Sequence, residues 1–113
     1  MSETELSKAI RDALTRRGFW VERVNAGKTK VKRGWLYGAA IGTPDILVIA
    51  PVYGWLEVKV ELGKLSPEQV TWHDRARNFG IHVEVVRSVE GALRTVEGWV
   101  AARREQIEPK GAA

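Results

Sequence analysis

Two acidic residues and a lysine near the middle of the chain form a pattern that can do phosphate chemistry. Asp45 follows Pro44, and Glu57 and Lys59 stand two positions apart in a segment typical of a buried strand. Residues two apart on a strand point to the same face, so Glu57 and Lys59 share one face while Val58 points into the core. Charged groups in a buried strand need partners or a metal ion. A plain salt bridge is the alternative that this spacing leaves open.

The donor atoms of this pattern suit a hard divalent cation. The two carboxylates and the main-chain carbonyl of Val58 form an oxygen cage of the kind that Mg²⁺ or Mn²⁺ prefers. Such a cation polarises a phosphate and lowers the pKa of a bound water. Lys59 can orient that water or stabilise charge in the transition state. The pattern therefore predicts metal-assisted hydrolysis of a phosphodiester.

The pairing of the two strands decides whether Asp45 reaches this site. A hairpin that turns over residues 50–54 sets residue 45 opposite residue 59, on the face of Glu57 and Lys59. A four-residue loop over residues 51–54 turns Asp45 to the other face unless a bulge corrects it, because a slip of one residue reverses every side chain. Strand register is therefore a test of the predicted site.

The segments around these residues alternate between helical and extended patterns. Apolar residues at positions 6, 9, 10, 13 and 14 predict an amphipathic helix. Ser66, Pro67 and Gln69 form a helix start signal with a capping box between Ser66 and Gln69. The predicted helices cover residues 4–17, 66–79 and 89 onward, and the predicted strands cover 19–24, 35–37, 46–50, 55–60 and 82–87. The order α-β-(β)-β-β-α-β-α predicts one domain over residues 1–113, with a disordered tail from about residue 107.

Composition excludes several classes of protein. The chain has 113 residues, no cysteine and two histidines, His73 and His82. Disulfides, cysteine–zinc sites and thiol nucleophiles are excluded, and a zinc hydrolase is disfavoured. No apolar run approaches the roughly 18 residues of a membrane span, and the polar, acidic N-terminus is not a signal peptide. We therefore expect a cytoplasmic protein with no membrane partner and no small-molecule cofactor.

The positive charge is concentrated in the first part of the chain. Residues 1–43 hold nine Lys and Arg against four Asp and Glu, whereas residues 44–113 hold nine against ten. The basic residues Lys28, Lys30, Lys32 and Arg33 alternate as on a ribbon, and Trp35 follows them. Such a segment can contact the phosphates of a nucleic acid. The alternative is a solvated loop with Trp35 in the core.

Several short segments together form a rarer pattern than the acidic pair alone. They are Glu5-Leu6, Gly42-Thr43-Pro44-Asp45, Glu57-Val58-Lys59, Gly63 to Gln69, and Gly80 ahead of Val86-Arg87-Ser88. They span roughly residues 3–95, and the ordered G-x-L-S-x-x-Q segment directly after E-x-K is the most specific part. The pattern resembles the PD-(D/E)xK nuclease superfamily and, within it, the VRR-NUC family. The resemblance implies a restriction-endonuclease-like α/β fold, with a central mixed sheet flanked by helices.

The resemblance also implies a divalent-metal nuclease that uses Mg²⁺ or Mn²⁺. It places metal binding on Asp45, Glu57 and the carbonyl of Val58, and a catalytic role on Lys59. The predicted chemistry of the central residues and the implied family chemistry therefore agree.

Two peripheral residues also acquire site roles from the resemblance. It places a helix-borne acid at Glu5 and a site glutamine at Gln69, although Ser7 stands where the family often has Gln. The residues themselves allow other readings, because Glu5 is also a first-turn acid favoured by the helix dipole and Gln69 also completes a capping box. His73 lies one turn beyond Gln69, and a packed or exposed histidine is the alternative to a general base there.

These observations predict a metal-dependent DNA endonuclease. Phosphate contacts carry no sequence information and no base-reading motif is present, so we expect selectivity for DNA structure. One active site cuts one strand, so a homodimer that resolves four-way (Holliday) junctions by two symmetric nicks is the leading hypothesis. Two alternatives remain open, a nucleic-acid-binding module whose metal site has decayed and a nuclease subunit of a larger recombination complex.

Overall fold

The computed structural model describes residues 1–107, apart from the side chains of residues 28–30 and 36–37. Its elements are α1 (Glu3–Arg16), β1 (Trp20–Arg23), β2 (Lys28–Val31), β3 (Gly34–Tyr37), β4 (Ile46–Ala50), β5 (Gly54–Val58), α2 (Pro67–Asn78), β6 (Val83–Val86) and α3 (Val89–Ile107). The predicted elements are confirmed with small shifts of their ends. The tail predicted from about residue 107 lies almost wholly outside the described residues.

Helix starts are set by local side-chain caps. The Ser2 hydroxyl accepts a hydrogen bond from the Glu5 N–H, and the Glu5 carboxylate accepts one from the Ser2 N–H. The predicted capping box at the start of α2 is present in the same form between Ser66 and Gln69. The Ser88 hydroxyl accepts from a main-chain N–H of the first turn of α3 at 2.9 Å. These caps satisfy N–H groups that the first helical turn leaves without partners.

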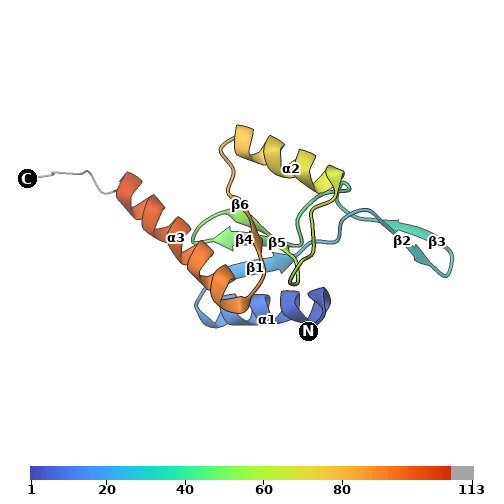
Figure 1. Ribbon diagram of the computed structural model, residues 1–113, viewed down its shortest axis with the longest axis horizontal. Helices are drawn as coiled ribbons and strands as arrows, with labels where there is room; N and C mark the ends of the chain where they lie inside the picture. The colour runs from blue at the N-terminus through green and yellow to red at the C-terminus, as the bar shows by residue number, and fades with distance from the viewer. Residues whose placement is uncertain (108–113) are drawn as a thin grey trace, which may run out of the picture.

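The central sheet has the strand order β1-β4-β5-β6. β1, β4 and β5 pair antiparallel, whereas β6 runs parallel to β5. Figure 1 shows α2 on one side of this sheet and α1 and α3 on the other. The sheet is therefore mixed and flanked by helices, as expected.

The main core fills the space between the sheet and the pair α1 and α3. Ile10 and Leu14 of α1 and Val96 of α3 are fully buried there against Leu56 and Ile46 of the sheet. This burial follows from the apolar stripe along α1 and from the apolar strands that it covers. Within residues 1–107, no helix is long and apolar enough to cross a membrane.

The segment expected to contain one short strand forms a two-stranded hairpin instead. β2 pairs antiparallel with β3, so that Lys28 lies opposite Tyr37 and Val31 opposite Gly34. This hairpin forms a separate sheet that projects from the body of the molecule (Figure 1). A segment with two lysines in four residues resembles a loop in sequence, and only pairing with β3 makes it a strand.

Candidate active site

The register between β4 and β5 brings the two acidic residues together. Ile46 pairs with Leu56 and Val48 with Gly54, so the same register continued by one residue sets Asp45 opposite Glu57. Asp45 therefore lies on the predicted face, but the expected pairing with Lys59 is wrong. The turn covers residues 49–53, one position earlier than expected, so the partner of Asp45 moves by two residues, and this even shift keeps the face unchanged.

A hydrogen bond holds Asp45 against the end of β5. The Asp45 Oδ2 atom accepts from the Val58 N–H at 2.8 Å. The N–H and C=O of one strand residue point to the same side of the strand, so the Val58 carbonyl also points toward the side of Asp45. The side chain of Val58 is 1% exposed and packs in the core on the opposite face, as predicted.

The loop before Asp45 is held by the first turn of α2. Gly42 has a φ of +97°, which an L side chain rarely adopts, and a Cβ there would lie 2.4 Å from the carbonyl oxygen of Glu68. The Thr43 hydroxyl closes the turn by donating to the Ala40 carbonyl at 2.6 Å. The loop that carries Asp45 and the helix that carries Gln69 are therefore in direct contact.

Glu57 is buried beneath α2 and is held there by two side chains. It is 1% exposed. Gln69 Nε2 donates to Glu57 Oε2 at 3.3 Å, and His73 Nε2 lies 3.2 Å from Glu57 Oε1. Burial raises the pKa of Glu57 to about 9, and hydrogen bonding and repulsion from Asp45 add to the effect. The charged form of Glu57 is therefore disfavoured unless a further cation lies beside it.

Gln69 makes both of the contacts that were alternatives in the sequence. Its Oε1 atom accepts from the Ser66 N–H at 2.9 Å, while its Nε2 atom donates to Glu57. A carboxamide has a separate acceptor and donor, so one side chain caps α2 and contacts the site. This geometry ties the orientation of the Glu57 carboxylate to the start of α2.

His73 is a buried, packed histidine, and its side chain contacts Glu57. It is 1% exposed, and burial, followed by the charge of Arg77, lowers its pKa. Its Nδ1 atom is buried and has no hydrogen-bond partner among the described residues. An N–H at Nδ1 would be left unpaired, so the neutral tautomer with the proton on Nε2 fits best, and that proton points to Glu57. The spacing of four from Gln69 was the signal in the sequence for this shared helix face.

Lys59 follows the end of β5 and is partly buried. Its main-chain N–H donates to the Val86 carbonyl at 3.1 Å, which continues the pairing with β6. Its charge lowers the pKa of Glu57, in opposition to burial and Asp45. The loop after it is fastened by Arg87, which donates to the carbonyls of Glu61 and Gly63 at 2.6 and 2.9 Å.

The acid of α1 that faces the site is Glu3. A cavity of about 270 Å³ opens beside Asp45 and Val58, and Glu3 is among its lining residues. Glu5 is not, and its carboxylate accepts from the Ser2 N–H instead. The site role of Glu5 therefore stays a prediction. The signal in the sequence was the apolar stripe, because Glu3 lies three positions before Leu6 and seven before Ile10 and so extends that face of the helix.

The donor set fits a hard divalent cation. Among the described side chains, no group of three His, Cys, Asp or Glu residues is arranged to hold a metal ion. The candidate site combines two carboxylates with a main-chain carbonyl, from Asp45, Glu57 and Val58. Oxygen donors alone, from the buried Glu57 and the half-buried Asp45 beside it, suit Mg²⁺ or Mn²⁺ better than zinc.

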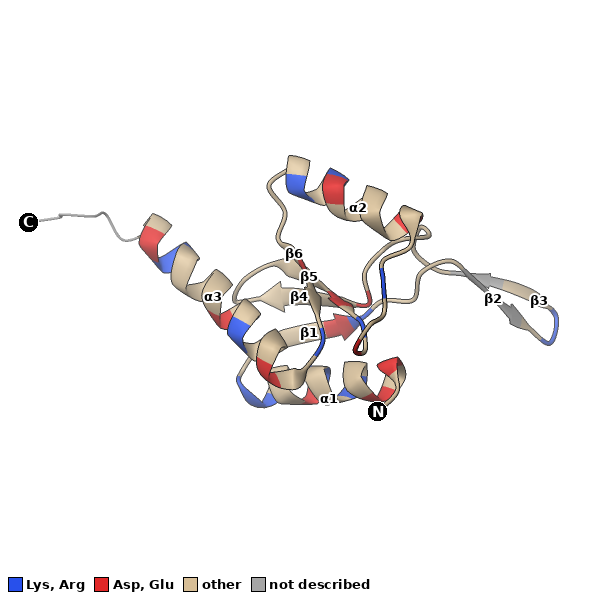
Figure 2. Ribbon diagram, in the orientation of Figure 1, with Lys and Arg blue, Asp and Glu red and all other residues tan. Residues whose placement is uncertain are grey.

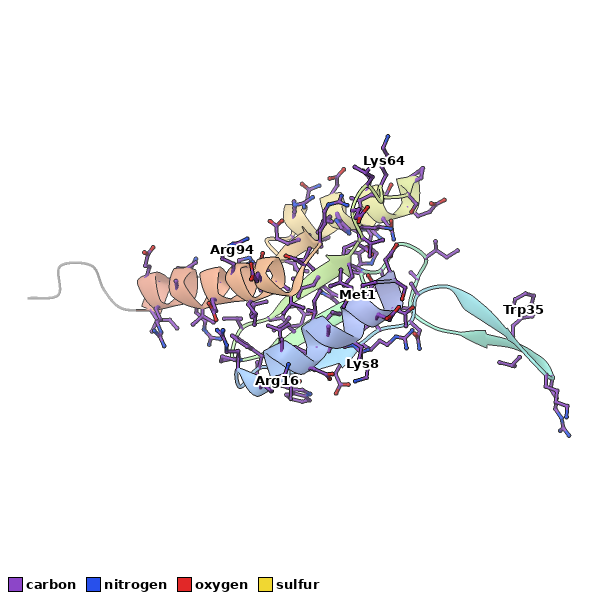
Figure 3. All side chains as sticks on the ribbon, turned by 60° about the horizontal axis from the view of Figure 1, so that its bottom comes forward. Met1, Lys8, Arg16, Trp35, Lys64 and Arg94 are labelled. Atoms are coloured by element: carbon purple, nitrogen blue, oxygen red, sulfur yellow. The ribbon has the colours of Figure 1, made fainter. Side chains whose placement is uncertain are left out.

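The basic segment lies on the projecting hairpin. Lys32 and Arg33 form the exposed turn between β2 and β3, and Figure 2 shows basic residues at this tip. Lys28 and Lys30 lie on β2, and their side chains are outside the described part of the structure. Trp35 lies on β3, away from the body (Figure 3), and is 47% exposed rather than in the core. The predicted phosphate contacts remain a prediction.

The sheet, the converging carboxylates and the covering α2 define a nuclease-type α/β domain of the PD-(D/E)xK superfamily. A family model described as the VRR-NUC domain matches residues 1–90, and the chain belongs to this family. A solved structure described as a "VRR_NUC domain" is similar, with a TM-score of 0.63 and 29% identity over 86% of this chain and 96% of that chain. No curated protein matches the sequence. The chain is thus a nuclease domain with DNA as its substrate.

Proposed function

We propose that this protein is a divalent-metal-dependent DNA endonuclease. The observation that carries the proposal is the approach of two carboxyl groups and the Val58 main chain at the end of the sheet. Asp45 accepts from the Val58 N–H at 2.8 Å, and Asp45 raises the pKa of the buried Glu57. A bound Mg²⁺ or Mn²⁺ would supply Lewis acidity and a water nucleophile there.

The residues of this chain would bind the metal, orient its ligand and stabilise charge on the phosphate. Asp45, Glu57 and the Val58 carbonyl would hold the metal, and Gln69 and His73 hold the Glu57 carboxylate in one orientation. Lys59 follows the metal ligands directly and offers a positive charge on the same face. In that position it would stabilise the charge that develops on the phosphate as the bond breaks.

The test is Asp45→Asn, assayed on plasmid and oligonucleotide DNA with Mg²⁺ or Mn²⁺. Loss of a residue that only hydrogen-bonds to a metal ligand costs about 10–100-fold, so loss of a direct ligand should lower turnover by more than about 100-fold. Asp74→Asn on the exposed face of α2 is the matched control, since Asp74 is 67% exposed. Wild-type turnover of Asp45→Asn at saturating metal would refute the site.

We further propose that the enzyme acts on branched DNA as a homodimer, with four-way junctions as the substrate. One catalytic site cuts one strand, and two sites related by two-fold symmetry can make the paired nicks that resolve a junction. Large apolar side chains offer contact area for a second copy: Trp20 on the edge strand β1 is 57% exposed, and Phe79 after α2 is 77% exposed. Aromatic residues are enriched in such interfaces.

A further inference from the structure

The cavity beside Asp45 has a second wall that the proposed metal site does not use. Its volume is about 270 Å³. The first turns of α1 and the chain leaving β1 form this wall. Its lining residues include Glu3, Ser7, Arg23 and Asn25. The wall is rich in groups that bind polar ligands.

Two of these groups have no partner among the described residues. Ser7 is 7% exposed, and its hydroxyl is buried without a hydrogen bond. A buried hydroxyl without a partner is unfavourable for folding alone, and Ser7 is one of the residues that line the cavity. Arg23 forms no ion pair or side-chain hydrogen bond in the described part of the chain, although Glu3 and Asp45 line the same cavity.

The sign of the charge in the cavity depends on the metal. With a divalent cation on Asp45 and Glu57, the positive charges of the cation, Arg23 and Lys59 exceed the negative charges of the three acidic side chains. An anion is then the favoured ligand. Arg guanidinium, hydroxyl and carboxamide groups together are the ordinary recognition set for a phosphate.

The hairpin joins the body at this same wall. The Gly27 N–H donates to the Ala39 carbonyl at 2.8 Å, and the Ala39 N–H donates to the Asn25 carbonyl at 2.9 Å. A DNA strand that runs from the basic tip of the hairpin to Asp45 therefore passes Asn25 and Arg23. The ligand that this path brings to the cavity is the phosphate next to the one being cut.

We propose that Arg23, with Ser7 and Asn25, forms a subsite for the phosphate adjacent to the scissile phosphate. This inference rests on the proposed nuclease function and adds the residues that seat the cleaved strand. These residues bind and orient DNA, and they take no part in bond breaking.

The experiment measures DNA binding separately from cleavage. Fluorescence anisotropy of a short labelled duplex is recorded in Ca²⁺ for wild type, Arg23→Gln and the charge-conserving Arg23→Lys. The control is Arg16→Gln, which loses the same charge as Arg23→Gln. Arg16 lies at the far end of α1 from Met1 (Figure 3). Arg23→Gln should weaken binding about tenfold and flatten the slope of log affinity against log salt by about one unit, the share of one phosphate contact. Arg16→Gln should change neither.

Uncharged methylphosphonates then locate the contact. Each phosphate near the cut is replaced in turn, and the loss of affinity is compared between wild type and Arg23→Gln. One position next to the cut should weaken wild type about tenfold and leave Arg23→Gln unaffected. Equal losses in both proteins at every position would show that Arg23 acts only through long-range charge, and would overturn the proposal.

Ser7→Ala tests the buried hydroxyl. Removal of an unpartnered group should raise the melting temperature and raise the KM for DNA with kcat unchanged. An unaltered KM would remove Ser7 from the subsite. If wild type cleaves DNA and Arg23→Gln matches Arg16→Gln in affinity and slope, the subsite fails alone. If wild type neither binds nor cleaves DNA with any metal, the proposed function fails and the subsite fails with it.

Discussion

Glu57 is the residue whose environment is least suited to a charge. It is 1% exposed and shares its surroundings with Asp45. Without a metal, the folded protein therefore favours a protonated Glu57, whereas the unfolded chain releases that proton near the ordinary carboxyl pKa. The binding of the metal and the stability of the fold are linked through this one group.

We predict that Glu57→Gln stabilises the metal-free protein at alkaline pH. The pKa of Glu57 is raised from 4.5 to about 9 in the folded state. Wild type therefore holds its full stability below about pH 4.5 and loses it as pH rises toward 9. Glutamine carries no such charge, so Glu57→Gln should melt roughly 5–10 °C higher than wild type at pH 8 in a chelator.

The melting difference should shrink at pH 4.5, where both side chains are neutral. Added Mg²⁺ should raise the melting temperature of wild type and not that of Glu57→Gln. Thermal unfolding followed by circular dichroism gives both comparisons. If wild type and Glu57→Gln have the same melting temperature at pH 8 without metal, the charge on Glu57 does not destabilise the fold and the prediction is wrong.

His73 is predicted to act through the orientation of Glu57. Its Nε2 atom lies 3.2 Å from Glu57 Oε1. In His73→Gln the amide nitrogen can replace Nε2, whereas the shorter side chain of His73→Asn cannot reach. His73→Asn should weaken Mn²⁺ binding by about 10–100-fold, and His73→Gln should retain affinity to within a few-fold. Calorimetry with Mn²⁺ measures the affinity of each variant. Equal losses of affinity in the two variants would show that His73 contributes through packing and not through its hydrogen bond to Glu57.

Among the elements, the hairpin β2–β3 contributes none of its described side chains to the core. It forms its own two-stranded sheet, and an isolated hairpin is marginally stable in water. Its root is tied to the loop before Asp45 by hydrogen bonds from Gly27 and Ala39. The hairpin is thus an arm whose base lies at the site and whose tip carries Lys32 and Arg33.

We predict that Lys32→Gln with Arg33→Gln weakens binding to all DNA sequences alike. Each lost contact with a duplex phosphate removes about 0.9 units from the slope of log affinity against log salt, so the pair should remove about two. The matched control is Arg94→Gln with Arg104→Gln on α3. Adding Lys28→Gln and Lys30→Gln should flatten the slope further. If the slope of log affinity against log salt equals that of the control, the hairpin tip makes no contact with the DNA phosphates.

The proposed assembly of the protein is a two-fold dimer. We predict a dimeric mass by light scattering at micromolar concentration, and faster nicking of four-way junctions than of plain duplex. Mixing wild type with an excess of Asp45→Asn gives the sharper measurement. Mixed dimers hold one working site, so they should nick a junction once without resolving it. A monomer that nicks junctions no faster than duplex would defeat this part of the proposal and leave the nuclease standing.

The local elements and the chemistry of the centre could be predicted from the order of residues along the chain. The apolar stripe of residues 6–14, the capping box from Ser66 to Gln69 and the apolar run 46–50 each depend on residues close in the chain, and each formed the expected element. The acidic pair and the segment after it were specific enough to indicate the family, which the match over residues 1–90 confirms.

Which side chains meet could not be predicted in this way, because it depends on the packing of the whole fold. It set Asp45 across from Glu57, turned Glu3 rather than Glu5 toward the cavity, and brought His73 onto Glu57. It also made a hairpin of the segment that resembles a loop. The physical reason is the same in each case. Register, helix rotation and strand pairing are settled by contacts between residues far apart in the chain, and the free energy of those contacts is not visible in any local pattern.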